Sequence, residues 1–145
     1  MDRNIKRVAV SFPLMLTVMS SGAAPGDQYK KDEKNMTGML VRIAEIEVVA
    51  EHLKEYKAIL KEEAEASVRL EPGVTAIFPI HRKENPTQIS ILEIYANREA
   101  YESHLATPHF QKYKTTTLKM VKSLKLVDME ALDAVTMPRV FKKMK

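Results

Sequence analysis

The pattern of hydrophobic and polar residues beyond residue 38 predicts a strand followed by a long helix. In residues 39–49 the two classes alternate with a period of two, as in a β-strand. Between residues 51 and 70 the hydrophobic positions instead recur every three or four residues, which is typical of an amphipathic helix of about five turns, with charged residues on its other face. Pro72 and Gly73 are expected to end this helix, because neither continues a helix well.

The next segment predicts two strands, two short helices and a last strand. Residues 74–82 and 88–96 are expected to be strands, joined by the turn "KENPT". Asn97 is a predicted N-cap for a helix through Leu105, and Thr107 caps another helix that begins with Pro108. Residues 124–129 are the predicted final strand. The inward stripe of the second short helix is expected to comprise Phe110, Tyr113, Thr117, Met120, Val121 and Leu124.

This order of elements predicts an α+β fold, in which a ferredoxin-like antiparallel sheet carries its helices on one face. The strands at 39–49, 74–82 and 88–96 are hydrophobic on both alternating sides. The face without helices must therefore also be covered. Face-to-face pairing of two sheets is the simplest solution, so we expect a homodimer, the arrangement called a dimeric α+β barrel.

The N-terminal 23 residues have the features of a secretory signal peptide. Basic residues precede a hydrophobic run at 8–19, and small residues at 21–23 suit a cut before Ala24. The run contains Pro13 and is shorter than the roughly 20 residues of a membrane-spanning helix, so no stable membrane anchor is expected. We predict export to a bacterial periplasm or the medium. The alternative is an N-terminal segment that is disordered or docks on the domain.

The composition of the chain limits its domain organisation and the reactive groups that it can use. Of the 145 residues, we expect 24–37 to form a flexible linker, 38–130 one folded domain and 131–145 a C-terminal tail. The net charge of +4 is spread along the chain, so no nucleic-acid partner is expected. The absence of cysteine excludes disulfides and thiolate chemistry. Reactive groups must come from His, Glu, Tyr or an external cofactor.

Two histidines, His104 and His109, are the first candidates for chemistry. In an unbroken helix their five-residue spacing would separate the side chains by about 140°, whereas metal-binding helices use an i, i+4 pair. We therefore predict no metal site. His104 shares a stripe with Tyr101 and should point inward, as a hydrogen-bonded core residue or a cavity residue. His109 begins the next helix, where an imidazole either exchanges a proton near neutral pH or lies at the surface.

Glu93 is a lone carboxylate in a hydrophobic strand. It lies on the strand side shared by Ile91 and Tyr95. A carboxylate in such surroundings needs a partner or has its pKa raised. If this side faced the space between two paired sheets, Glu93 and Tyr95 would line a cavity. The alternative is a structural carboxylate that binds an Arg or Tyr across the dimer.

The motifs of residues 72–113 resemble the antibiotic biosynthesis monooxygenase family. That family has a Pro-Gly before its second strand, an Asn-Pro-Thr type of turn, a Glu-x-Tyr or Glu-x-Trp strand, and a helical Ala-x-x-x-His-x-x-x-x-His-Phe. The resemblance extends over about residues 38–130. The matching positions are Pro72-Gly73, Asn85-Pro86-Thr87, Glu93 with Tyr95, and Ala100, His104, His109 and Phe110.

The resemblance implies a dimeric α+β barrel that acts on a quinol or another electron-rich aromatic with O2 and without metal or flavin. We predict that the catalytic residues are Glu93, His104 and His109. The predicted substrate contacts are Phe78, Ile91, Tyr95 and Tyr101.

A cofactor-independent monooxygenase of this kind agrees with the chemistry of the chain. A deprotonated dihydroxyaromatic is electron-rich enough to pass an electron to O2, so the protein need supply only a base, orientation and a dry pocket. The Asn, Trp and His set of the haem-degrading relatives is missing, since the chain has no Trp. Two alternatives stay open. One is a non-catalytic dimeric module that binds a small apolar ligand, and the other is an isomerase of the same fold.

Overall fold

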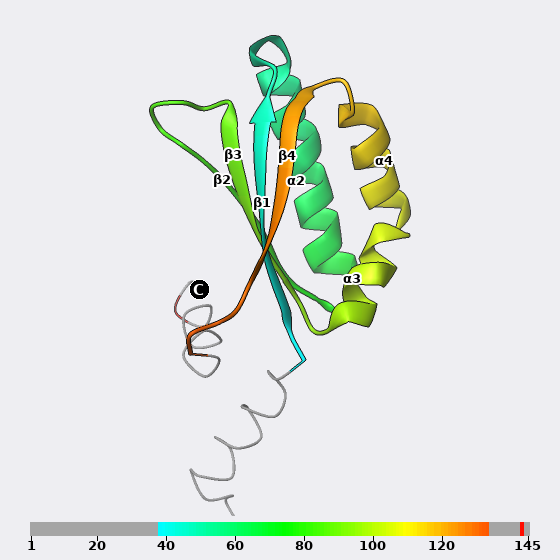
Figure 1. The fold of residues 1–145 in the computed structure, drawn as a ribbon. Coiled ribbons are helices and arrows are strands. Elements are labelled where there is room, and N and C mark those ends of the chain that lie inside the picture. The colour runs from blue at the N-terminus through cyan, green and yellow to red at the C-terminus, as the bar shows by residue number, and fades with distance from the viewer. Residues whose placement is uncertain (1–37, 134–142, 144–145) are drawn as a thin grey trace, which may run out of the picture.

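The computed structural model describes residues 38–133 and residue 143, and these form an antiparallel sheet with helices on one face (Figure 1). The sheet order is β2-β3-β1-β4, with every neighbouring pair antiparallel. This arrangement confirms the predicted ferredoxin-like α+β fold. Along the chain the elements are β1 (Leu40–Val48), the short helix η1 (Ala50–His52), α2 (Leu53–Leu70), β2 (Val74–His81), β3 (Gln88–Tyr95), α3 (Arg98–Leu105), α4 (Pro108–Thr117) and β4 (Val121–Met129).

Some predicted segments lie outside the described residues. They are the signal peptide at 1–23, the linker at 24–37 and most of the tail at 131–145. Within the part of the chain that the structure describes, no helix is both long and apolar enough to cross a membrane.

The break between the capped helices α3 and α4 determines where the two histidines lie. The side chain of Asn97 accepts a hydrogen bond of 2.8 Å from the backbone N–H of Ala100, and so caps α3. Thr107 caps α4 by accepting from the N–H of Phe110, and Pro108 takes the first helical position. Both caps were predicted. Because the chain changes direction between them, His104 and His109 do not follow the geometry of one continuous helix.

The boundary between α4 and β4 differs from the prediction. The helix ends at Thr117, and the strand already begins at Val121. The hydroxyl of Thr117 donates to the carbonyl of Tyr113, and the carbonyl of Thr117 accepts from the N–H of Met120 in a turn. Val121 then pairs with Val48 of β1. The predicted helical stripe was therefore wrong at Val121 and Leu124. These residues belong to β4, which pairs with β1 far away in sequence.

The main core lies between the sheet and the helices. Ile46 and Ile91 of the sheet and Tyr56 and Leu60 of α2 are at most 5% exposed there. The other face carries a hydrophobic row across all four strands, made of Phe78, Leu92, Ile43 and Val127 in register. We call this row the open face. Phe78 is 47% exposed and the other three residues are half-buried, so the described residues of one chain leave this row only partly covered.

The "EPG" turn brings the end of α2 against α3. A Cβ atom at position 73 would lie 2.5 Å from the Cβ of Ala100, which is closer than real Cβ contacts come. The carbonyl of Gly73 also accepts a hydrogen bond of 2.8 Å from the N–H of Ala96. Gly73 is thus needed for close approach, and the turn presents its first residue, Glu71, to the helix pair.

Replacing Gly73 with alanine is expected to lower the free energy of unfolding by about 1–3 kcal/mol, because the added methyl must push α3 away. Urea denaturation followed by circular dichroism measures this loss. Gly38→Ala is the control, since a Cβ there meets only the carbonyl oxygen of Ala96 at 3.9 Å. Equal losses in the two variants would contradict the close-approach argument.

Candidate functional site

A cavity of about 490 Å³ lies between the sheet and the helices of a single chain. Its lining is mostly apolar and aromatic, with a few ionisable side chains. Glu93 and Tyr95 therefore face the helices, and their cavity is not the space between two paired sheets that the sequence had suggested. The sheet contributes Arg42, Ile91 and Glu93 among other residues, and the helices contribute Glu63, His104 and Tyr113.

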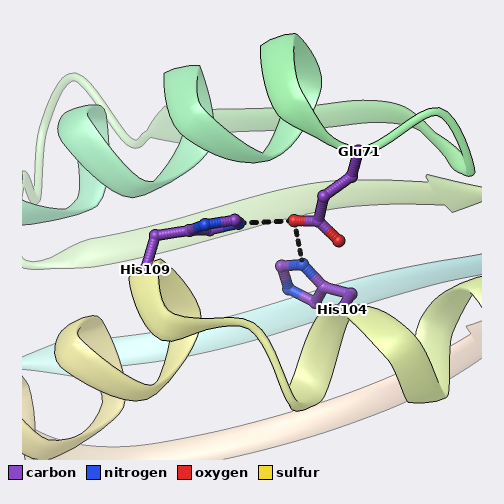
Figure 2. Close-up of side chains that lie close together, drawn as sticks. All are labelled: Glu71, His104 and His109. Atoms are coloured by element: carbon purple, nitrogen blue, oxygen red, sulfur yellow. Dashed lines mark hydrogen bonds and ion pairs between the residues drawn. The ribbon is translucent and has the colours of Figure 1, made fainter.

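One carboxylate oxygen contacts both histidines (Figure 2). Oε1 of Glu71 lies 3.0 Å from Nδ1 of His104 and 2.6 Å from Nε2 of His109. The contact links the C-terminal end of α2 to α3 and to the first turn of α4. His104 is 3% exposed, so this cluster is largely shielded from water.

The hydrogen bonds determine which group carries the protons. Burial alone would raise the pKa of Glu71, but the hydrogen bonds from His104 and His109 outweigh it and hold the pKa below its usual value. Glu71 is therefore an ionised acceptor, and each imidazole donates to it. His104 thus has its proton on Nδ1, and its Nε2 keeps a free lone pair in the neutral ring.

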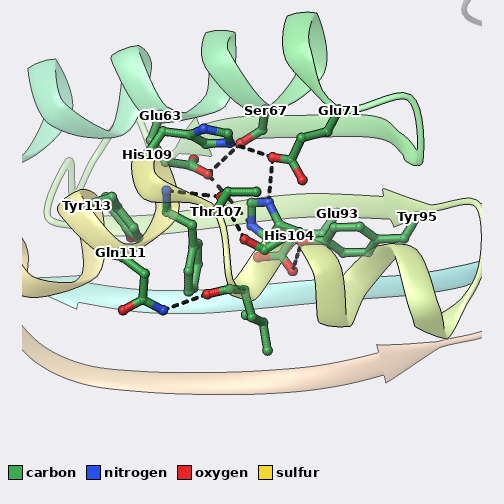
Figure 3. Close-up of polar contacts among 12 residues, drawn as sticks. Glu63, Ser67, Glu71, Glu93, Tyr95, His104, Thr107, His109, Gln111 and Tyr113 are labelled. Atoms are coloured by element: carbon green, nitrogen blue, oxygen red, sulfur yellow. Dashed lines mark hydrogen bonds and ion pairs between the residues drawn. The ribbon is translucent and has the colours of Figure 1, made fainter.

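A second carboxylate faces the other side of His104 (Figure 3). Glu63 of α2 is 5% exposed and accepts a hydrogen bond of 2.7 Å from the hydroxyl of Ser67. Its Oε1 lies 3.7 Å from Nε2 of His104. Burial raises the pKa of Glu63, and the hydrogen bond from Ser67 offsets this only in part. His104 therefore lies between one ionised carboxylate and one that tends to hold its proton.

The third carboxylate, Glu93, lies on the floor of the cavity. It accepts a hydrogen bond of 3.2 Å from the hydroxyl of Tyr95, and burial raises its pKa. Arg42 is its cross-strand neighbour, but its guanidinium binds Asp128 at 2.7 Å and lies 4.5 Å from the ring centre of Tyr101. Glu93 is thus held by a tyrosine and not by the nearest arginine.

The cavity holds most of the residues predicted from the sequence. Glu93, Tyr95, Tyr101, Ile91 and His104 all line it. The other two predicted residues, His109 and Phe78, do not line the cavity. His109 is hydrogen-bonded to Glu71. Phe78 lies on the open face, on the far side of the sheet.

Residues 39–116 match the model of the antibiotic biosynthesis monooxygenase family. The chain belongs to this family. The match confirms the resemblance drawn from the motifs, and it includes every element from β1 to nearly the end of α4.

Solved structures agree with the family assignment. A proposed antibiotic biosynthesis monooxygenase from Bacteriodes thetaiotaomicron VPI-5482 is 51% identical, covering 66% of this chain and 91% of that protein with a TM-score of 0.66. A proposed monooxygenase from Lactobacillus acidophilus NCFM is 30% identical over 64% of this chain and 44% of its own, at a TM-score of 0.63. A protein from Nitrosomonas europaea at 24% identity and a TM-score of 0.62, covering 65% of this chain and 90% of its own, shares the fold. Among curated proteins, none matches.

Glu63, Glu71 and Arg42 are site residues that the sequence analysis of this family member missed. Glu63 lies three residues after Leu60 and seven after Tyr56, on the buried stripe of α2. The prediction that charged residues occupy only the outer face of this helix was wrong at Glu63. The sequence did contain an indication of Glu63, because this acidic residue occupies a position of the hydrophobic stripe of α2. Glu71 gave no comparable indication, because only the tertiary fold brings it to the histidines.

The cluster of Glu71, His104 and His109 is also a group whose ligand atoms could surround a metal ion, since these atoms lie within 4.8 Å of one another. The spacing argument against metal assumed a continuous helix, which the break at Thr107 removes. However, both nitrogens contact the same carboxylate oxygen at hydrogen-bond distances. Ligands at about 2.1 Å around a tetrahedral metal would lie roughly 3.4 Å apart. We therefore assign the cluster as hydrogen-bonded.

Glu71→Gln is expected to lower the free energy of unfolding at pH 7 by about 1–3 kcal/mol, because it removes the charge from two hydrogen bonds. The pKa of Glu71 is lower in the folded than in the unfolded chain, so its stabilisation exists above the unfolded pKa. It is lost as the pH falls through the folded pKa. The gap between wild type and variant should therefore shrink in acid.

Urea denaturation of both proteins at several pH values measures this gap. Glu102→Gln, at an exposed position of α3, is the matched control and should not change stability. A gap that stays constant into acid would contradict an ionised Glu71.

Proposed function

We propose that this protein is a cofactor-independent monooxygenase that acts on a quinol or another electron-rich aromatic with O2. The observation that carries the proposal is an oriented base at an aromatic-lined cavity. Glu71 fixes the proton of His104 on Nδ1, so Nε2 is free to accept a proton. His104 itself lines the cavity, together with Tyr95 and Tyr101.

The cavity suits a flat, mostly apolar molecule that carries hydroxyl groups. Its size is within the usual range for small-molecule sites, and its wall is largely apolar. The rings of Tyr95 and Tyr101 meet edge to face with centres 5.3 Å apart, and the ring of His104 lies 5.4 Å from that of Tyr95. In our proposal His104 removes a hydroxyl proton, and Glu93 with Tyr95 orients the ring.

The reaction needs no external reductant. A quinol and O2 can give a hydroxyquinone and water, with all four electrons coming from the quinol. Removal of the hydroxyl proton comes first, because the resulting anion donates an electron to O2 more readily. A water-poor cavity then limits side reactions of the oxidised substrate. The protein's contribution is to bind, orient and deprotonate.

His104→Asn is expected to lower kcat for quinol oxidation by about 10²–10⁴-fold, the usual contribution of a general base. Asparagine can still donate to Glu71 but has no counterpart of Nε2. Glu93→Gln should have a smaller effect, through orientation. Oxygen uptake with a panel of reduced quinones, corrected for autoxidation, measures the rates. His81→Asn, at an exposed position, is the control.

Four outcomes decide between the hypotheses. Unchanged turnover in both cavity variants would refute the assigned site. No turnover by the wild type with any quinol would favour a binding module without catalysis. Product formed without O2 would favour an isomerase. Activity lost to a chelator and restored by a metal would refute cofactor independence.

We also propose that two chains pair through their open faces to form a dimeric barrel. Phe78, Ile80 and Met129 are each between 47% and 51% exposed, and Ile43 and Leu92 lie beside them in the sheet. A hydrophobic sheet face of this kind supports pairing, because exposure of such a surface to water is unfavourable.

Phe78→Arg is expected to shift a dimer to a monomer in light scattering, since it places a charge in the paired surface. Val68→Arg, at a 48% exposed position of α2, is the matched control and should leave the dimer intact. A wild type that is monomeric at every concentration would refute pairing. A dimer that survives Phe78→Arg would refute this interface.

A further inference from the structure

Glu63 is a buried carboxylate that lies beside His104 and is not paired with a lysine or arginine of the described residues. It is 5% exposed, and its contacts within the described part of the chain are the hydroxyl of Ser67 and the ring of His104. No Lys or Arg of that part pairs with it. Burial of such a group is costly, and a costly ionisable group in a cavity is a candidate for function.

The position of Glu63 relative to His104 is specific. Its Oε1 and the Nε2 of His104 are 3.7 Å apart, and both side chains line the cavity (Figure 3). That separation is too long for a hydrogen bond. An oxygen atom beside the pair could lie about 2.8 Å from each of them. The gap therefore fits one hydroxyl group held by both residues.

We propose that Glu63 is a second catalytic residue, which holds the substrate hydroxyl together with His104 and donates a hydrogen bond to the oxyanion. This inference rests on the proposed function, because it needs an aromatic hydroxyl as substrate. The hydroxyl O–H bond breaks, its proton moves to Nε2 of His104, and the electron pair stays on the substrate oxygen. Protonated Glu63 donates a hydrogen bond to that oxygen and stabilises the anion.

The two carboxylates around His104 thus have opposite roles. Glu71 is ionised and holds the His104 proton on Nδ1, while burial raises the pKa of Glu63. A neutral carboxylic acid that donates to a substrate oxyanion needs such a water-poor environment. The other titratable groups that act on Glu63, or that it acts on, are His104, His109, Glu71, Glu93, Tyr56, Tyr95 and Tyr113.

The pH dependence of kcat in Glu63→Gln tests the role. Wild type should give a bell-shaped profile, in which the acid limb reports the base and the alkaline limb reports loss of the Glu63 proton. The amide cannot lose a proton in this range and still donates a hydrogen bond, so the variant should lack the alkaline limb and keep its activity at high pH. Glu65→Gln, an exposed neighbour on α2, should match wild type. An alkaline limb retained in Glu63→Gln would overturn the proposal.

A measurement without substrate separates this inference from the proposed function. In NMR, the side-chain carboxyl signal of Glu63 should titrate above the usual pH range of a glutamate, because burial raises its pKa. Such a titration without quinol turnover would keep the buried acid and reject the monooxygenase. Turnover with a Glu63 signal in the usual range would reject the role of Glu63 alone.

Discussion

The shared carboxylate of Glu71 is the contact on which the site depends. It comes at the end of α2, and its two partners come from α3 and from the start of α4. One ionised group therefore sets the relative positions of three helices and the tautomer of His104. The close approach at Gly73 makes this possible, because it brings the end of α2 against α3. The cavity lies next to this junction.

The three acidic groups of the site differ in pKa, because they receive different hydrogen bonds. Glu71 has two imidazole donors, and its pKa is lowered despite burial. Glu63 and Glu93 each have one hydroxyl donor, from Ser67 and Tyr95, and burial keeps their pKa values raised. The same side chain type thus has a raised pKa at two positions of one site and a lowered pKa at a third. Such a difference allows a site to hold a base and an acid at one pH.

Local sequence was sufficient for most of the fold. The change of period from two to three and four predicted β1 and α2, and the caps Asn97 and Thr107 predicted where α3 and α4 begin. These features act over a few residues, so neighbouring residues encode them. The end of α4 was misplaced because pairing between β4 and β1 decides it, and those strands are distant in sequence.

The candidate site was predictable only in part. Alternation along β3 placed Glu93 and Tyr95 on one side, but it could not say whether that side faces helices or another sheet. Phe78 was expected in the site, yet cross-strand register places it on the open face. Glu71 and Glu63 were missed, because no spacing rule relates them to His104, which is 33 residues beyond Glu71.

The sequence by itself determined the elements, their order, the family and the candidate histidines, because periodicity, capping and motifs are local properties of the chain. Only the tertiary structure decided which groups meet. It packed the end of α2 against the break between α3 and α4, joined both histidines to one carboxylate and set Glu63 opposite Nε2 of His104. Protonation depends on burial and on donors that lie far away in sequence, so the chemistry of the site comes from the fold.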